Sequence, residues 1–136
     1  MAYEGPIEDR LAIRERIEAY SDAVFRRDAD AWIANWCENA VWSLPGLSVE
    51  GKPAIKSAWV EAMRAFKFAA FFATPGSIVV SGDAARARVY TTEVLTDASG
   101  AVRRIIGSYD DELTRENGAW LFRTRAYRIE LDQTEA

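Results

Sequence analysis

Three stretches decide the fold: AARARVYTTEVLT at residues 84–96, AVRRIIGSYDDELTR at 101–115 and AWLFRTRAYRIEL at 119–131. In the first, Arg86, Arg88 and Tyr90 alternate with smaller apolar residues, a period of two that is typical of a strand with one wet and one buried face. The Asn117-Gly118 pair between the second and third stretches favours a tight hairpin. The sequence therefore predicts three long antiparallel strands. A twisted sheet of this length must curl, and helices must cover one of its faces.

Composition limits the classes of function. The 136 residues, 49% of them hydrophobic, suit a single domain over 1–136. The net charge of −4, from 17 basic and 21 acidic residues, gives no basic footprint, so we expect no nucleic-acid or membrane partner. The single cysteine, Cys37, cannot form an internal disulfide and is expected to be a buried small hydrophobe. With no apparent signal pattern, a cytoplasmic location is expected.

Histidine is absent from the chain, which restricts its chemistry. Without imidazole, and with carboxylates scattered along the sequence, we expect no metal site and no bound cofactor. Proton transfer would then depend on carboxylates and tyrosines.

Helical periodicity marks the first half of the chain. Ile13, Ile17, Tyr20 and Val24 recur at helical spacing and predict a helix over 7–27. Asp30 is expected to be the N-cap of a short helix at 31–37. A third helix should begin at Gly51-Lys52-Pro53. Its apolar stripe consists of Ile55, Ala58, Trp59, Ala62, Met63 and Phe66.

Two further strands complete the pattern. We expect a short strand at 40–44, ended by Pro45-Gly46, and a longer one from 68–73 into 78–80 with a bulge at Thr74-Pro75-Gly76, because proline cannot donate to a ladder. Helices segregated from one antiparallel sheet define an α+β fold.

The stretches RIEAYSDAVFRRDADAW at 16–32 and WCENAVW at 36–42, the GKPAI helix start at 51–55 and the closing NGAW at 117–120 resemble the nuclear-transport-factor-2-like superfamily. Within it the chain is most similar to the SnoaL-like group, which includes polyketide cyclases, scytalone dehydratase and hexachlorocyclohexane dehydrochlorinase. The resemblance implies a cone: a curved antiparallel sheet, mixed at its edge, with three N-terminal helices over the concave face. It identifies the fold better than the reaction, because one fold hosts many functions.

The resemblance implies a broken catalytic dyad. Dehydratases of this group pair a carboxylate with a histidine, which removes a proton beside the leaving group. Asp28 matches the carboxylate position, but Phe71 lies near the place of the histidine. Asp28 could equally be a turn residue that hydrogen-bonds the backbone between two helices.

Arg125 matches an arginine that lines the pocket of dehydrochlorinase-like relatives. Period two places Leu121, Arg123, Tyr127 and Ile129 on its face of the last strand. A buried guanidinium needs a carboxylate partner, and we predict Asp28, with Asp111 as the other option. A solvated arginine on the sheet edge is the alternative.

Asp111 is a polar residue on the apolar face that also carries Tyr109. In ketosteroid-isomerase relatives, a neutral carboxylic acid on this strand and a tyrosine from the first helix, here Tyr20, hold a developing enolate oxygen. The general base of those relatives falls near Leu44, so that mechanism would lack its base. Asp111 could instead pair with Arg123 or Arg125.

Glu93 shares the inward face of the first long strand and is expected near the opening of the cone, where it could be only a rim charge. An aromatic wall suited to a flat or hydrophobic ligand is expected from Trp42, Trp59, Phe66, Phe68, Phe71 and Phe72, although such residues are often simply core.

Two functions remain open. The first is a cofactor-independent lyase, isomerase or cyclase for a small hydrophobic, possibly cyclic or polyketide-like molecule, with Asp28 or Asp111 as acid or base and Tyr20, Tyr109 and Arg125 for polarisation. The second is a binding or dimerisation module of the same fold. A homodimer or homotrimer is expected, with Tyr90, Val94 and Trp120 on the outward face of the sheet.

Overall fold

The computed structural model describes residues 2–136 and confirms the α+β fold. The elements are, in chain order, β1 (Tyr3–Glu4), α1 (Ile7–Arg26), α2 (Ala29–Ile33), β2 (Trp36–Leu44), β3 (Leu47–Glu50), α3 (Lys52–Met63), β4 (Phe68–Ser81), β5 (Ala84–Thr96), β6 (Val102–Glu116) and β7 (Ala119–Glu135). One seven-stranded sheet has the order β1-β4-β5-β6-β7-β2-β3. It is antiparallel except for the β1–β4 and β2–β7 pairs, so it is mixed, as expected.

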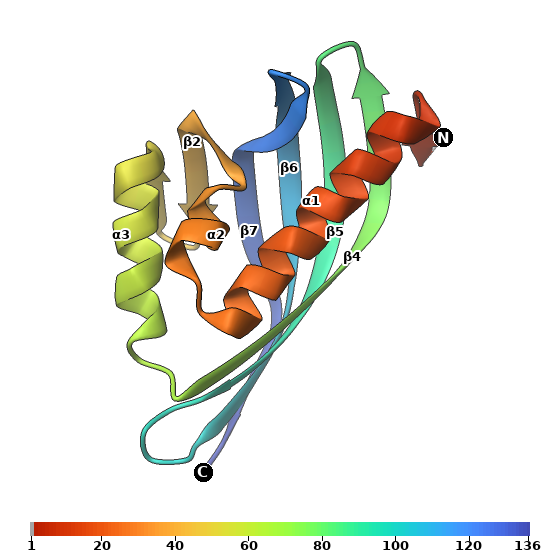
Figure 1. The fold of residues 1–136 in the computed structure, drawn as a ribbon. Helices are drawn as coiled ribbons and strands as arrows, with labels where there is room; N and C mark the ends of the chain where they lie inside the picture. The colour runs from red at the N-terminus through yellow and green to blue at the C-terminus, as the bar shows by residue number, and fades with distance from the viewer. Residues whose placement is uncertain (1) are drawn as a thin grey trace.

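The helices lie on one face of the curved sheet (Figure 1). α1 runs diagonally across the central strands, while α2 and α3 lie near β2. The ends of β4–β7 beside the β5–β6 turn and the C-terminus extend beyond the helices (Figure 1). The concave face is therefore covered at one end and open at the other. No helix within residues 2–136 has both the length and the apolar character needed to cross a membrane.

The core lies between α1 and the sheet. Ile13, Ile17, Tyr20 and Val24 are buried, which confirms the predicted stripe of α1. The stripe predicted for α3 is confirmed at Ile55, Trp59 and Met63, but Ala62 is exposed because the helix contacts the rest of the protein over a narrower face.

The second helix differs from its prediction. It spans Ala29–Ile33 rather than 31–37, and its N-cap is Asp28 rather than Asp30. Asp28 has an extended backbone, and its Oδ1 accepts a hydrogen bond from Ala31 N at 3.0 Å. Trp36 and Cys37 belong to β2, because Trp36 pairs with Phe122 of β7.

The pairing of β6 with β7 contains two bulges, and each reverses the alternation of side chains along β7. Leu113 pairs with Phe122 and Glu112 with Thr124, so Arg123 is extra. The residues before it therefore have the opposite alternation to that predicted: Phe122 and Trp120 are buried, whereas Arg123 is exposed. The predictions that Arg123 and Leu121 share the face of Arg125, and that Trp120 faces outward, were wrong.

The aromatic wall is only partly on the inner face. Phe71 is buried opposite Glu93, whereas Phe68 and Phe72 are exposed because alternate residues of β4 point to opposite faces. The prediction that Phe68 and Phe72 line the interior was therefore wrong. The expected bulge in β4 is confirmed by the register shift between Pro75 and Ser77.

Candidate active site on the concave face

A buried ion pair occupies the covered end of the cone. Arg125 Nε donates to Asp111 Oδ1 at 2.8 Å, and Nη2 donates to Oδ2 at 3.0 Å. The side chains are 1% and 0% exposed. The residues are direct cross-strand partners on β6 and β7, which brings both side chains to the inner face.

Aromatic rings surround the guanidinium. Arg125 Cζ lies 3.8 Å from the ring centre of Tyr109, 4.1 Å from that of Phe122 and 4.5 Å from that of Tyr20. Such cation–π contacts offset part of the cost of burying the charge. Burial raises the pKa of the Asp111 carboxyl, although the charge and hydrogen bonds of Arg125 oppose that shift. Both carboxylate oxygens of Asp111 accept from Arg125, and hydrogen bonds to the ionised form oppose its protonation.

Asp28 is not part of this pair. Its carboxylate caps α2 and lies 3.2 Å from Arg26 Nη1 at the surface. The predicted pairing of Asp28 with Arg125 was therefore wrong: the carboxylate is committed to the backbone of the turn. The other option, Asp111, is the observed partner.

Two tyrosines and a tryptophan form a buried network beside the ion pair. Trp42 Nε1 donates to Tyr109 Oη at 3.2 Å, and the phenols of Tyr20 and Tyr109 act on each other electrostatically. Burial raises the pKa of both phenols, which keeps them protonated.

The deepest aromatic residues fill the interior. Trp32 stacks on Trp59 with ring centres 4.8 Å apart, and Tyr20 contacts Phe71 at 5.5 Å. Trp42 packs against Trp32 at 5.3 Å. Trp42, Trp59 and Phe71 therefore contribute to a packed core in this structure.

Glu93 lies at the boundary between this core and the open end. Its carboxylate accepts a hydrogen bond from the Tyr127 hydroxyl, and the ring of Tyr127 lies 4.7 Å from that of Tyr109. Burial raises the pKa of the Glu93 carboxyl, while the bond from Tyr127 and the positive charge of Arg103 act in the opposite direction. A carboxylate of raised pKa on a concave face is a candidate general base.

Gly107 makes room for this contact. A Cβ at position 107 would lie 2.5 Å from both Cε1 and Cζ of Tyr127. Any side chain there would displace the ring, and with it the hydroxyl that binds Glu93.

An open hollow of about 660 Å³, named the mouth hollow, lies at the open end of the cone. Its lining comprises Ala65, Phe66, Leu95, Asp97, Ala101, Arg103, Asp132 and Thr134. Leu95 and Glu93 are two residues apart on β5, so their side chains lie on the same face of the strand. The hollow therefore continues the inner face toward the open end of the cone.

Sequence reasoning missed Arg103, Asp132 and Gly107. Asp132 faces inward because Glu130 is extra at the second β6–β7 bulge, and β7 runs to Glu135 rather than to residue 131. No pattern in the sequence marks this bulge. Within residues 2–136, Cys, Asp and Glu side chains form no cluster that could hold a metal ion.

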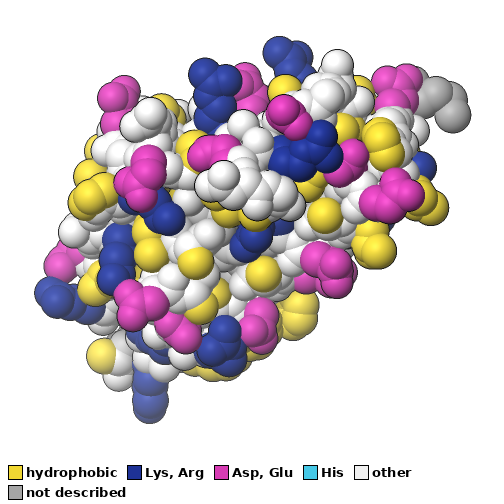
Figure 2. Space-filling model, turned by 45° about the horizontal axis from the view of Figure 1, so that its top comes forward, with side chains coloured by type: hydrophobic (Ala, Val, Ile, Leu, Met, Phe, Trp, Pro, Cys, Tyr) yellow, Lys and Arg dark blue, Asp and Glu magenta, His cyan; other side chains and the backbone are white. Residues whose placement is uncertain are grey.

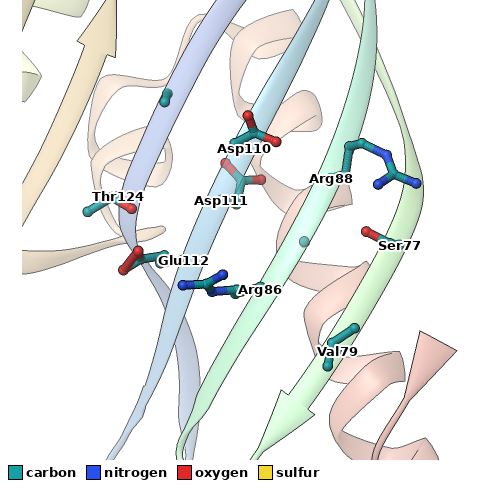
Figure 3. Close-up of a pocket in the computed structure, with 10 residues that line it drawn as sticks. Ser77, Val79, Arg86, Arg88, Asp110, Asp111, Glu112 and Thr124 are labelled. Atoms are coloured by element: carbon teal, nitrogen blue, oxygen red, sulfur yellow. The ribbon is translucent and has the colours of Figure 1, made fainter. Parts of the chain in front are cut away.

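Another hollow, of about 540 Å³, lies on the opposite face of the sheet (Figure 3). In this view Arg86 of β5 extends toward β6, whereas Glu112, its cross-strand partner on β6, extends toward Thr124 of β7. The view of Figure 2 shows basic and acidic side chains interspersed, with no field of one sign. Asp111 is on the lining of the outer hollow, but its carboxylate is paired with Arg125, so the mouth hollow is the stronger candidate for chemistry.

Comparison with protein families identifies the class. The SnoaL-like domain model matches residues 6–126, and the chain belongs to this family. No curated protein matches the sequence significantly.

Solved structures agree with the family. A candidate aromatic ring hydroxylase from Novosphingobium aromaticivorans is 25% identical, with a TM-score of 0.87 and 96% of each chain covered. A candidate scytalone dehydratase from the same organism is 19% identical, with a TM-score of 0.87 over 96% of this chain and 89% of that one. A type-3 hexachlorocyclohexane dehydrochlorinase from Novosphingobium barchaimii is 17% identical, with a TM-score of 0.80 over 96% and 92%. The last two likenesses establish a shared fold.

Proposed function

We propose that the protein is a cofactor-independent enzyme that removes a proton from a carbon atom of a small hydrophobic molecule, with the Glu93 carboxylate as the base. One observation carries the proposal: Glu93 combines a raised pKa and a hydrogen bond from Tyr127 with a place on the inner face of β5, two residues from Leu95 of the mouth hollow. Burial favours a neutral carboxyl, so the ionised form gains basicity.

The chemistry balances without a cofactor. The Glu93 carboxylate takes a proton from a carbon next to a carbonyl group. The C–H electron pair becomes a C=C bond and the π pair of the C=O bond moves to the oxygen, which gives an enolate. Where a second C=C bond is conjugated with the enolate, the protonated Glu93 returns its proton to the far carbon of that bond, which completes an isomerisation. Where the next carbon carries a leaving group, the enolate re-forms the carbonyl group and expels it, and Glu93 then releases its proton to water.

The other candidate residues support this step. Tyr127 orients the carboxylate, and Tyr109 packs against Tyr127 from the covered end. Asp111 and Arg125 hold the positions of Tyr20 and Tyr109 through their contacts with the guanidinium. This assigns Asp111, Arg125 and Tyr20 to positioning, and Asp28 to the cap of α2.

A binding protein without chemistry is the second candidate. The resemblance predicts that the catalytic histidine of dehydratases would fall near Phe71, and aromatic side chains fill the deep end of the cone. Such a protein would hold the same small hydrophobic molecules in the mouth hollow without changing them.

Hydrogen exchange separates the two candidates. The probe is α-tetralone, an apolar ketone with exchangeable hydrogens beside its carbonyl group, in deuterated water. The parent protein should accelerate deuterium uptake, measured by proton NMR, and Glu93→Gln should lose at least ~100-fold of that acceleration. Glu61→Gln is the control, because Glu61 is an exposed carboxylate paired with Arg64 on α3. If the parent binds α-tetralone without accelerating exchange, the protein is a binding protein that does not catalyse proton removal.

A further inference from the structure

Arg103 is the cation of the mouth hollow, and its partner holds it in a fixed orientation. Arg103 Nε donates to Asp132 Oδ1 at 2.9 Å, and Nη2 donates to Oδ2 at 2.7 Å. The two side chains are 40% and 36% exposed. Within residues 2–136, only Nε and Nη2 of this guanidinium are hydrogen-bonded, so the N–H groups of Nη1 remain available as donors.

The position of Arg103 relative to Glu93 follows from the strand register. Leu95 of β5 pairs with Arg103 of β6, and Glu93 pairs with Ile105. Glu93 and Arg103 are therefore diagonal neighbours on one face, a spacing of ~7–8 Å that long side chains can bridge. The charge of Arg103 acts on Glu93. A small molecule between them could contact both.

The charges of the region select against anions. Asp132 compensates Arg103, and Asp97 lies on the same lining. Together with Glu93 these groups are three carboxylates and one guanidinium. A carboxylate ligand would meet a net negative field, whereas an uncharged carbonyl oxygen could still accept from Nη1.

We propose that Arg103, held by Asp132, binds the oxygen of an uncharged carbonyl-containing substrate while Glu93 faces the adjacent C–H group. Phe66, Leu95 and Ala101 would contact the apolar part of the molecule. Arg103 is then a catalytic residue, because its N–H stabilises the charge that develops on the oxygen when the enolate forms. This inference rests on the proposed function for the reaction but concerns recognition, which can be measured separately.

Binding is measured in a Glu93→Gln background, where catalysis is absent. The affinity for each probe can therefore be measured whether or not Glu93 is the base. The probes are α-tetralone, the hydrocarbon tetralin and a tetralin carboxylate, each titrated by calorimetry. Arg103→Met should weaken α-tetralone binding by about 5- to 10-fold and leave tetralin unchanged. The matched control is Arg104→Met, since Arg104 is the next residue along the strand and pairs with Glu135 at 3.6 Å.

Asp132→Asn tests the role of the charge. Removing this carboxylate should improve binding of the tetralin carboxylate by about 5-fold or more relative to α-tetralone. The proposal is overturned if Arg103→Met and Arg104→Met bind α-tetralone equally, if Glu93→Gln does not bind α-tetralone at all, or if Asp132→Asn leaves the carboxylate-to-ketone ratio unchanged. Circular dichroism of each variant verifies the fold, and Arg103→Lys replaces Arg103→Met if the latter is unfolded.

Discussion

Glu93 lies directly across the β4–β5 ladder from Phe71, and both side chains face the interior of the cone. The resemblance to dehydratases predicts their histidine near Phe71. If that prediction holds, Glu93 is the carboxylate next to the expected place of the imidazole, and we expect the proton acceptor of this chain one strand along the sheet.

The Arg125–Asp111 pair should dominate the stability of the covered end. Arg125→Met leaves the Asp111 carboxylate buried without its partner and should cost ~3–5 kcal/mol in the free energy of unfolding, measured by denaturant titration. The double variant Arg125→Met with Asp111→Leu should recover much of that loss. Asp28→Asn serves as the control and should change stability by less than ~0.5 kcal/mol, because asparagine also caps helices. Equal effects of Arg125→Met and Asp28→Asn would contradict the assignment of the pair.

Gly107→Ala should disturb the active site without removing any functional group. The added methyl group would overlap the ring of Tyr127 and move its hydroxyl from Glu93. We expect exchange activity to fall ~10-fold or more, and the pKa of Glu93 to rise further because it loses a hydrogen bond to its charged form. Combining Gly107→Ala with Tyr127→Leu should restore the stability lost in the single variant but not the activity. Normal activity in Gly107→Ala would show that Tyr127 does not orient the base.

Glu93 should make stability depend on pH in a defined direction. Burial raises its pKa in the folded state above the value in the unfolded chain, so the folded state binds more protons between the two values. The parent should therefore lose stability relative to Glu93→Gln as the pH rises through the folded-state pKa. Below the ordinary pKa of glutamate, the difference in the free energy of unfolding between the parent and Glu93→Gln should be constant. Denaturant midpoints of both proteins over a pH series measure this difference. A difference that is the same at every pH would mean that the pKa of Glu93 is not raised in the folded state.

Self-association should use the outer face of the sheet. Phe72, Thr92, Ile106 and Leu131 form one row across four strands, and the three apolar members are exposed. A second copy would cover this apolar row, which favours a homodimer or homotrimer. Ile106→Glu should dissociate the assembly in sedimentation velocity, while Glu61→Gln on α3 should not. A parent protein that is monomeric at micromolar concentration would contradict the prediction.

The sequence predicted the long strands well because their alternation is regular. The range 84–96 matches β5 without error, and the tight turn at Asn117-Gly118 precedes β7 as expected. The stripe of α1 was equally clear, since burial repeats there at helical spacing. These features are local, and the chain encodes them within a few residues.

The errors on β7 came from a non-local cause, whereas the error on Asp28 came from the resemblance. The extra residue Arg123 reverses the alternation of β7, so Trp120 turned inward and Arg123 outward, and no local pattern marks a bulge. Asp28 was assigned to the interior by resemblance, but its carboxylate caps α2. The environment of Glu93 depends on how far the sheet curls over it. That curvature belongs to the whole sheet and cannot be read from one strand.

The pH dependence of α-tetralone exchange, compared with a direct titration of Glu93, decides whether the Glu93 carboxylate is the base. Carbon-13 NMR of the labelled carboxyl group gives the pKa of Glu93 in the presence of the groups that act on it, namely Tyr127, Arg103, Tyr20 and Tyr109. The exchange rate should rise with pH through one ionisation, whose midpoint lies above the ordinary range of glutamate and coincides with the pKa measured by NMR. Glu93→Gln should lack this ionisation. A rate profile that keeps the same midpoint in Glu93→Gln, or that does not change where Glu93 titrates, would show that another group is the base.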